Sequence, residues 1–356
     1  MSTENQSDAR GRVLVTGGAG YVGSRLVPEL LAAGWRVRVL DLELYGDAGP
    51  VAWAADPRWP SWSQRLERLT GDIRDPEVVG QAVSGVDAVI HLAGISHDPT
   101  DGFDEVLARQ CNFDAVGLVL AHARQSGVRR FLHASTSSVY GIQSADDIVE
   151  ALEPSPIGPY ARYKSLSEWL VRSAAGPDFC AVNLRSATVC GWSPRQRFDL
   201  TVNKLTIDAL TKGVITVHGG EQRRPNVHID DLVRCYCMLL EADAETISGK
   251  TYNLSQINLT VGDIARLIQS ELGDLDVRID IAPIHDKRDY HLCADRLERD
   301  LGFRAETPIE AAVRTLRHHA LELNSYSDSE DAQYYNLRSM NLERKGSAYR
   351  FVGGQS

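Results

Sequence analysis

Residues 12–23, RVLVTGGAGYVG, decide the fold of this chain. The run Val13–Val15 is apolar and rich in β-branched side chains, which predicts a buried parallel strand. Three glycines follow at three-residue spacing, and the apolar residues of 21–31 recur with helical periodicity. Strand, glycine turn and helix in this order predict a dinucleotide site, because glycine lets the backbone approach a pyrophosphate and the start of the helix offers free N–H groups.

A second strand indicates which dinucleotide this site prefers. Residues 36–40, RVRVL, predict a strand that ends at Asp41. A carboxylate there accepts hydrogen bonds from the adenosine ribose hydroxyls and repels a 2′-phosphate, which favours NAD over NADP. Arg25, Arg36 and Arg38 are the counter-argument, because an arginine could neutralise such a phosphate. We expect Arg36 and Arg38 to lie on a strand face instead.

Composition restricts the class of protein. A chain of 356 residues with net charge −10 and 43% hydrophobic residues can bury a large core. The acidic balance argues against nucleic acid or a membrane as partner, and no apolar run approaches the roughly 20 residues of a membrane helix. Neither the six cysteines nor the histidines have the spacing of metal ligands, so we expect free thiols, no metal and a cytoplasmic protein.

The order of the predicted elements indicates the domains. Strands and helices alternate up to about residue 185, which predicts a doubly wound parallel α/β sheet. The Trp- and Pro-rich connection 46–64 is expected to be an elaborated loop, and strands at 227–231 and 251–254 are expected to return to the main sheet. The expected divisions are a disordered lead-in at 1–10, the NAD-binding domain at 11–185 with 226–256 returning to it, a smaller C-terminal α/β substrate lobe at 186–322 and a polar tail at 323–356.

Two later segments carry the residues suited to catalysis. HASTSSVYG, 133–141, closes a strand, and PYARYK, 159–164, opens a helix. Tyr160 and Lys164 are four residues apart and share one helical face. A nearby ammonium lowers the pKa of a phenol from about 10, so Tyr160 can exchange a proton near neutral pH. The hydroxyl of Thr136 can bond the same substrate oxygen.

These motifs together resemble a known family. TGGAGYVG, GDIRD, HLAG, STSSVYG, YARYK and RRPNVHIDD occur in the order seen in extended short-chain dehydrogenase/reductases of the NAD-dependent epimerase/dehydratase family, most of which act on nucleotide sugars. The match runs from about residue 12 to about residue 320. The resemblance implies a Rossmann-type fold and Thr136, Tyr160 and Lys164 as the catalytic set. It also implies that the dinucleotide contacts Gly17, Gly20, Tyr21, Val22, Gly23, Asp41, Asp72, Ile73, Leu92, Ala93, Asn112, Tyr160 and Lys164.

Departures from the family pattern bear on the reaction. Family dehydratases carry Asp-Glu directly after the catalytic Thr, where this chain has Ser137 and Ser138. Serine offers no comparable acid or base at neutral pH, which argues against a 4,6-dehydratase. Thr188 stands where many sugar epimerases have Asn. By the resemblance the substrate would be contacted by Ser137, Ser138, Thr188, Arg195, Arg197, Asn203, Arg224 and Arg288, with Arg224 and Arg288 holding the nucleotide diphosphate.

The resulting expectation is an NAD-dependent nucleotide-sugar epimerase acting at C4. It would work through a transient 4-keto sugar, with NAD regenerated in each turnover. The alternatives are a nucleotide-sugar 4-ketoreductase or dehydrogenase with net cofactor turnover, and a non-catalytic NAD-binding regulator. The resemblance also implies a homodimer that pairs helices at 103–126 and 160–175.

Overall fold

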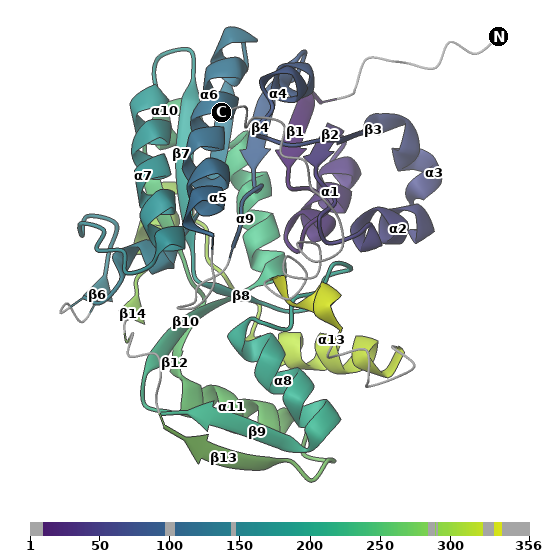
Figure 1. Cartoon of the computed structure of the whole chain (residues 1–356), viewed down its shortest axis with the longest axis vertical. Coiled ribbons are helices and arrows are strands. Elements are labelled where there is room, and N and C mark those ends of the chain that lie inside the picture. Colours follow the sequence, from purple (N-terminus) through teal and green to yellow (C-terminus); the bar gives the residue numbers. More distant parts are fainter. Residues whose placement is uncertain are drawn as a thin grey trace.

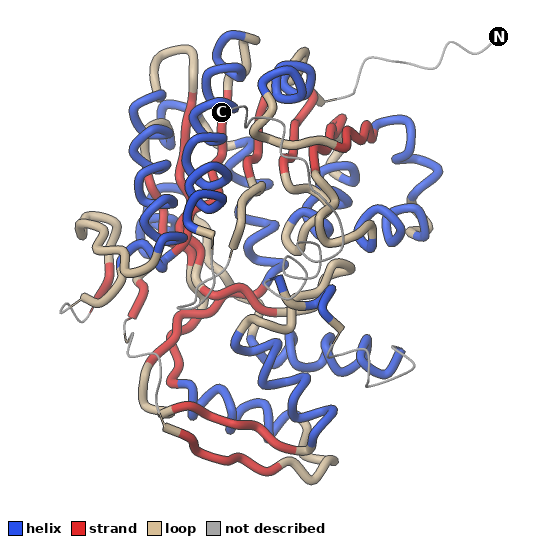
Figure 2. The backbone as a smooth tube through the Cα atoms, in the orientation of Figure 1, coloured by secondary structure: helices blue, strands red, loops and turns tan. Residues whose placement is uncertain are grey.

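The computed structural model describes residues 10–96, 104–143, 147–283, 289, 291–322 and 331–336. Figure 1 shows a larger lobe built on one sheet, with a smaller lobe below it that contains α8, α11 and α13. Figure 2 shows that the helices of the larger lobe lie on both faces of the sheet.

The larger lobe contains the predicted doubly wound sheet. Its seven strands lie in the order β11-β7-β5-β4-β1-β2-β3, and every neighbouring pair is parallel. From β1 the chain continues to β2 on one side, and from β4 it continues to β5 on the opposite side. The carboxyl ends of the neighbouring strands β1 and β4 therefore border a crevice, which is where open α/β sheets bind ligands. The strand bounds are β1 Arg12–Thr16, β2 Arg36–Asp41, β3 Leu66–Thr70, β4 Ala88–His91, β5 Arg130–Thr136, β7 Cys180–Ser186 and β11 Thr251–Leu254.

Alternating apolar residues attach two layers of helices to this sheet. Val13 and Val15 belong to the core formed with α1 (Gly23–Ala32) and α9 (Ile229–Glu241). Leu14 faces the opposite core, formed with three other helices. Both faces of β1 are therefore buried, as its apolar sequence predicts. The three helices are α4 (Pro76–Val83), α6 (Ala115–Gln125) and α7 (Pro159–Ala174).

The helix expected at 103–126 is divided. α5 (Glu105–Arg109) passes into a π-helical turn, Gln110–Asp114, before α6 begins. This turn places Asn112 in the interior, where no part of it is exposed. A π-turn inside an α-helix often accompanies a functional site.

The connection at 46–64 is not the loop that its Pro and Gly content suggests. It forms α2 (Ala48–Ala55), α3 (Trp59–Trp62) and a short 3₁₀ turn. Trp53 and Trp62 are almost fully buried, and the Trp53 indole donates to the Ser24 carbonyl of α1 at 3.0 Å. Burial of large aromatic surfaces against α1 outweighs the local turn preference of the sequence.

The smaller lobe has its own sheets. β10 (Arg223–His228) lies between β8 (Thr188–Cys190) and β12 (Ile257–Thr260), whereas β9 (Val214–His218) pairs with β13 (Arg278–Ala282). The strand expected at 227–231 therefore does not join the main sheet, and its last residues begin α9. The strand at 251–254 does join, as β11. The remaining elements are α8 Thr201–Lys212, α10 Ala244–Ile247, α11 Val261–Glu271, α12 Asp295–Leu301, α13 Ile309–Glu322, the pair β6 Asp147–Ile148 and β14 His291–Leu292, and 3₁₀ turns at Ser137–Tyr140 and Ala332–Tyr334.

Candidate active site

A cavity of about 750 Å³ lies at the carboxyl ends of β1, β2, β4 and β5. Residues of both lobes line it. The predicted site residues that it brings together are Gly17, Gly20, Tyr21, Val22, Gly23, Asp41, Asp72, Ile73, Leu92, Ala93, Thr136, Ser137, Ser138, Tyr160, Lys164, Thr188, Arg195, Arg197 and Arg224. Asn112 and Asn203 are not among the lining residues, and Arg288 lies outside the described residues.

The glycine turn is shaped by contacts that a side chain would obstruct. Gly17 has φ +72°, and a Cβ there would lie 2.7 Å from the backbone nitrogen of Ala93. A Cβ on Gly23 would lie 2.4 Å from the carbonyl oxygen of Gly18. No side chain caps the N-terminus of α1, so no side-chain oxygen competes with an anion for the positive end of the helix dipole there.

Asp41 is oriented by the backbone around this turn. Its Oδ2 accepts the N–H of Ala19 at 2.8 Å, and its Oδ1 accepts the N–H of Glu43 at 2.8 Å. Each oxygen keeps a lone pair for a ribose hydroxyl. Burial raises the pKa of Asp41, although both backbone hydrogen bonds act to lower it.

The three arginines that would favour NADP either have other partners or lie far from Asp41. Arg25 on α1 pairs with Asp230 at the start of α9 at 2.6 Å. Arg38 is buried and donates to Glu67 and to three carbonyls around the end of α4. Arg36 is exposed at the start of β2, the end opposite Asp41. This arrangement supports the preference for NAD.

Asp72 and Ile73 form another wall of the cavity. The Asp72 carboxylate accepts a hydrogen bond from Arg74, with Nε 3.0 Å from Oδ1. Arg74 also donates to the side chain of Gln110 at 2.9 Å. Burial acts to raise the pKa of Asp72, but the hydrogen bonds from Arg74 outweigh it and the pKa is lowered. Asp72 is therefore an acceptor held in place by a cation.

Asn112 supports the site from behind. Its Oδ1 accepts the N–H of Ile95 at 3.0 Å, and its Nδ2 donates to the Ile95 carbonyl at 3.0 Å. A Cβ on Gly94 would lie 2.5 Å from that Oδ1. Gly94 thus leaves the room that Asn112 needs to hold the loop after β4.

Asn203 joins the two lobes beneath the glycine turn. Its Oδ1 accepts the N–H of Gly191 at 2.9 Å, and its Nδ2 donates to the Tyr21 hydroxyl at 3.2 Å. The same hydroxyl donates to the Gly191 carbonyl at 2.8 Å, and Ser193 donates to the Tyr21 carbonyl at 2.6 Å. Asn203 thus supports the site through Tyr21.

Thr136, Tyr160 and Lys164 meet at the carboxyl end of β5. The Lys164 ammonium donates to the Ala134 carbonyl at 2.7 Å, which ties α7 to β5. Burial lowers the pKa of Lys164 to about 8, and the charge of Glu168 acts in the opposite direction. Thr136 Oγ1 accepts the N–H of Ser138 at 3.1 Å, which leaves the Thr136 proton available for a substrate oxygen.

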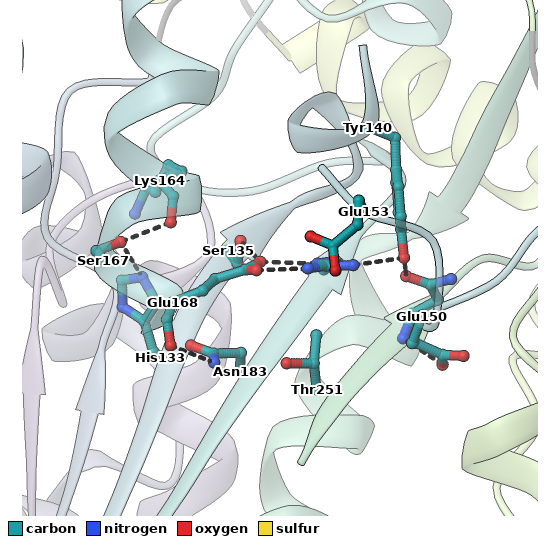
Figure 3. A network of polar contacts seen from close by, with 12 residues as sticks. His133, Ser135, Tyr140, Glu150, Glu153, Lys164, Ser167, Glu168, Asn183 and Thr251 are labelled. Carbon is teal, nitrogen blue, oxygen red and sulfur yellow. Dashed lines mark hydrogen bonds and ion pairs between the residues drawn. The ribbon is translucent and has the colours of Figure 1, made fainter. Parts of the chain in front are cut away.

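A buried network fixes this end of β5 against α7, as Figure 3 shows. Glu168, one turn after Lys164, accepts two hydrogen bonds from Arg185 and one from the hydroxyl of Ser135. Arg185 also donates to the Tyr140 hydroxyl at 2.7 Å. The network connects the strand residue before Thr136 to the helix that carries Tyr160.

Several residues of the site were not predicted from the sequence. Asp199 pairs with Arg197 at 2.9 Å, and Arg197 also donates to Ser96 at 3.0 Å. Tyr45 and Asn336 line the cavity from the two ends of the chain. The sequence RQRFD at 195–199 places Arg197 and Asp199 two residues apart, which could have indicated their ion pair. No sequence pattern indicates that residues near 336 reach the site.

Comparison with known proteins agrees with the resemblance. The profile of the NAD dependent epimerase/dehydratase family matches residues 13–255, which is more than half of the chain. The chain belongs to this family. The family is NAD-dependent, which confirms the predicted cofactor, and the uncapped start of α1, the glycine cradle and the oriented Asp41 fit that dinucleotide.

Three proteins illustrate its similarity to other members. It is 29% identical over 305 residues to dTDP-glucose 4,6-dehydratase of Streptomyces niveus, covering 82% of this chain and 87% of that protein. It is 30% identical over 260 residues to the uncharacterized protein y4nG of Sinorhizobium fredii, covering 72% of this chain and 58% of y4nG. Among solved structures, MoeE5 in complex with UDP-glucuronic acid and NAD is 26% identical with TM-score 0.74, covering 88% of this chain and all of that one.

The described residues contain neither a membrane-spanning helix nor a metal-binding cluster. No helix there is long and apolar enough to cross a membrane. No group of three or more His, Cys, Asp or Glu side chains in the same part of the chain could hold a metal ion. All six cysteines are free thiols, and Cys180, Cys190 and Cys235 are buried.

Proposed function

We propose that this protein is an NAD-dependent nucleotide-sugar 4-epimerase. One observation carries the proposal: Thr136, Tyr160 and Lys164 share a cavity with the glycine turn, and Ser137 and Ser138 follow Thr136 where dehydratases have acids. Oxidation at C4 needs only the first three side chains. Elimination of water needs an acid and a base in addition.

The chain's own residues supply proton transfer and orientation. Tyr160 takes the proton from the sugar hydroxyl and returns it, and the Lys164 ammonium stabilises the phenolate formed in between. Thr136 donates its hydroxyl proton to the substrate oxygen and so orients it. NAD, when bound, supplies the reversible two-electron oxidation of the sugar carbon.

The acidic residues that line the cavity already have partners. Asp41 accepts two backbone N–H groups, Asp72 accepts Arg74 and Asp199 accepts Arg197. Glu43 pairs with Arg68 at 2.5 Å. Burial is outweighed by the arginine partners, which lower the pKa of Asp72 and of Asp199, so these two carboxylates stay ionised and are poorly suited to protonate a leaving hydroxyl. This supports epimerisation over dehydration.

Local cations suit a nucleotide diphosphate despite the net charge of −10. Arg195, Arg197 and Arg224 line the same cavity. Guanidinium groups bind phosphate oxygens through two parallel hydrogen bonds. We propose Arg224 as the diphosphate ligand in the smaller lobe, with Ser137, Ser138 and Thr188 contacting the sugar.

The relatives favour a second candidate, a 4,6-dehydratase, because one of them is a dTDP-glucose 4,6-dehydratase. A ketoreductase that exchanges its cofactor is the third. The three reactions differ in product, in solvent exchange and in cofactor demand, so one experiment separates them.

The protein as purified, with no cofactor added, is incubated in D₂O with UDP-, dTDP- and GDP-sugars and followed by NMR. We expect a 4-epimer without deuterium on a sugar carbon, and a Tyr160→Phe variant that binds NAD but forms no product. A 4-keto-6-deoxy sugar with deuterium at C5 would instead establish the dehydratase, because the carbon that loses its proton before water is eliminated takes a new one from the solvent. Turnover only with stoichiometric added cofactor would establish the reductase.

A further inference from the structure

We propose that Tyr45, Arg195 and Asn336 form a clamp that retains the dinucleotide by holding its pyrophosphate. Each comes from a different part of the chain. Tyr45 lies just beyond Asp41, Arg195 lies between β8 and α8, and Asn336 lies in the C-terminal segment 331–336. All three line the cavity.

Arg195 is a buried cation aimed into this cavity. The residue is 3% exposed, and its guanidinium carbon lies 4.0 Å from the centre of the Tyr45 ring. Its neighbour Arg197 forms an ion pair with Asp199, whereas Arg195 donates to the neutral amide of Asn336 at 2.6 Å. A buried cation held by a neutral partner is well placed to bind an anion.

Two polar atoms of this cluster have no hydrogen-bond partner among the described residues. They are Arg195 Nε and the Tyr45 hydroxyl, and both are buried. Buried polar groups are nearly always satisfied, so an orphan donor beside a cavity points to a ligand. Burial, together with the charge of Arg197, lowers the pKa of Arg195 to about 10, which a bound anion would reverse.

The position of the cluster indicates the dinucleotide rather than the nucleotide sugar. Tyr45 follows Asp41 by four residues in the same connection after β2. Asp41 and Arg195 are close enough to influence each other's pKa. Because Asp41 is the expected ligand of the adenosine ribose, an anion near it and near the glycine turn is the adjoining pyrophosphate.

Asn336 fastens the clamp. Its Oδ1 accepts from Arg195, while its Nδ2 donates to the Ser96 carbonyl at 3.1 Å, so one side chain joins two walls of the cavity. The segment that carries it is itself anchored. Phe198 N donates to the Tyr334 carbonyl at 3.0 Å, and their rings lie 5.0 Å apart. Residues 331–336 must therefore move for the clamp to open.

The test measures release of the dinucleotide with no sugar present, so its failure is separate from failure of the proposed reaction. The full chain is loaded with NADH, chased with excess NAD⁺, and release is followed by fluorescence. We expect release about tenfold faster in Asn336→Ala, which loses a hydrogen bond to a charged group. We expect Tyr45→Phe to release faster too, because it loses only the orphan hydroxyl.

Gln333→Ala is the matched control. Gln333 is exposed in the same segment, and its side chain donates to Asp331, two residues before it. Its release rate should equal that of the unaltered protein, measured well below the unfolding midpoint of every variant. Unchanged release in both Asn336→Ala and Tyr45→Phe would overturn the proposal. So would a loss of affinity for UDP with NADH release unaffected, because the cluster would then serve the nucleotide sugar.

Discussion

Arg185 and Glu168 form a two-pronged ion pair inside the protein, with Nε–Oε1 at 2.8 Å and Nη2–Oε2 at 2.6 Å. Their side chains are 4% and 6% exposed. Arg185 comes from β7 and Glu168 from α7, so the pair sets the distance between the sheet and the helix that carries Tyr160 and Lys164.

Replacing Glu168 by Gln should destabilise the fold strongly. The change leaves the Arg185 charge buried without a counter-charge, which costs about 3–5 kcal/mol in comparable cases. The free energy of unfolding in urea measures it. The double variant Glu168→Gln, Arg185→Met removes both charges and should recover much of the loss. A single variant as stable as the unaltered protein would contradict this role.

The low pKa of Lys164 predicts an alkaline limit to activity. Above about pH 8 the ammonium loses its proton and no longer stabilises a Tyr160 phenolate. The rate should therefore fall with an apparent pKa near 8. A Lys164→Arg variant keeps its charge, so its profile should lack this limb even if its rate is lower. If the rate of Lys164→Arg still falls above about pH 8, the fall is caused by another titrating group.

The same shift predicts a pH dependence of stability. In the unfolded chain Lys164 keeps its proton up to its ordinary pKa of 10.5, whereas in the folded protein it loses it at about 8. Between these values the unfolded state binds more protons, so this residue makes the free energy of unfolding rise with pH. Below about pH 8 its contribution is constant. Comparison with Lys164→Met across the window isolates the slope.

Thr136 offers a hydroxyl proton whose direction is set by the backbone. The Thr136 Oγ1 accepts the N–H of Ser138, so its own proton is directed away from that N–H. Thr136→Val removes this proton and should lose the hydrogen bond to the substrate oxygen on which negative charge develops. Such bonds contribute about 1.5–3 kcal/mol, which corresponds to a fall in kcat/KM of tenfold or more. Thr136→Ser keeps the hydroxyl and should retain most activity. Equal losses in both variants would point to packing instead.

Asp41→Asn should reduce the preference of the site for NADH over NADPH. The amide is neutral and can accept only through one of its two polar atoms, whereas the carboxylate now accepts Ala19 and Glu43 through two. We expect weaker binding of NADH and a smaller disadvantage of NADPH, measured by fluorescence titration. Arg36→Ala, at the other end of β2, should change neither affinity.

Exposed apolar side chains on α5 and α7 suit the predicted homodimer. Trp169 and Leu166 on α7 are 59% and 45% exposed, and Val106 on α5 is 65% exposed. A charge at Trp169 would have to be buried in such an interface. Light scattering should therefore find a dimer for the unaltered protein and a monomer for Trp169→Glu, while Leu275→Glu in the smaller lobe leaves the dimer intact. A monomeric unaltered protein would remove the dimer prediction.

Much of the fold and many of the residues that line the cavity can be predicted from local sequence. The glycine turn, Asp41, Thr136, Tyr160 and Lys164 could be predicted because each stands at a fixed offset from a strand end or within one helical turn. Their chemistry depends on neighbours that are close in sequence, so short motifs describe them well.

The remaining features depend on contacts between distant parts of the chain. The burial of Trp53 against α1 turns a Pro- and Gly-rich stretch into helices, which local propensity argues against. The strand at 223–228 pairs within the smaller lobe, where its partners lie 30 or more residues away. Asn336 reaches Ser96 across 240 positions of sequence, and its polar surroundings carry no periodicity that would indicate it.

Tyr21 belongs to the glycine turn, yet its hydroxyl donates to Gly191 and its carbonyl accepts from Ser193, both beyond the end of β8. Together with the bond from Asn203, three hydrogen bonds would break at one point if the lobes parted there. At about 1 kcal/mol each, they make a parted form about a hundredfold rarer than it would otherwise be. Exchange of small molecules in this protein should therefore proceed through movement of surface segments around a rigid junction, and its rate should respond little to substitutions that loosen the lobes elsewhere.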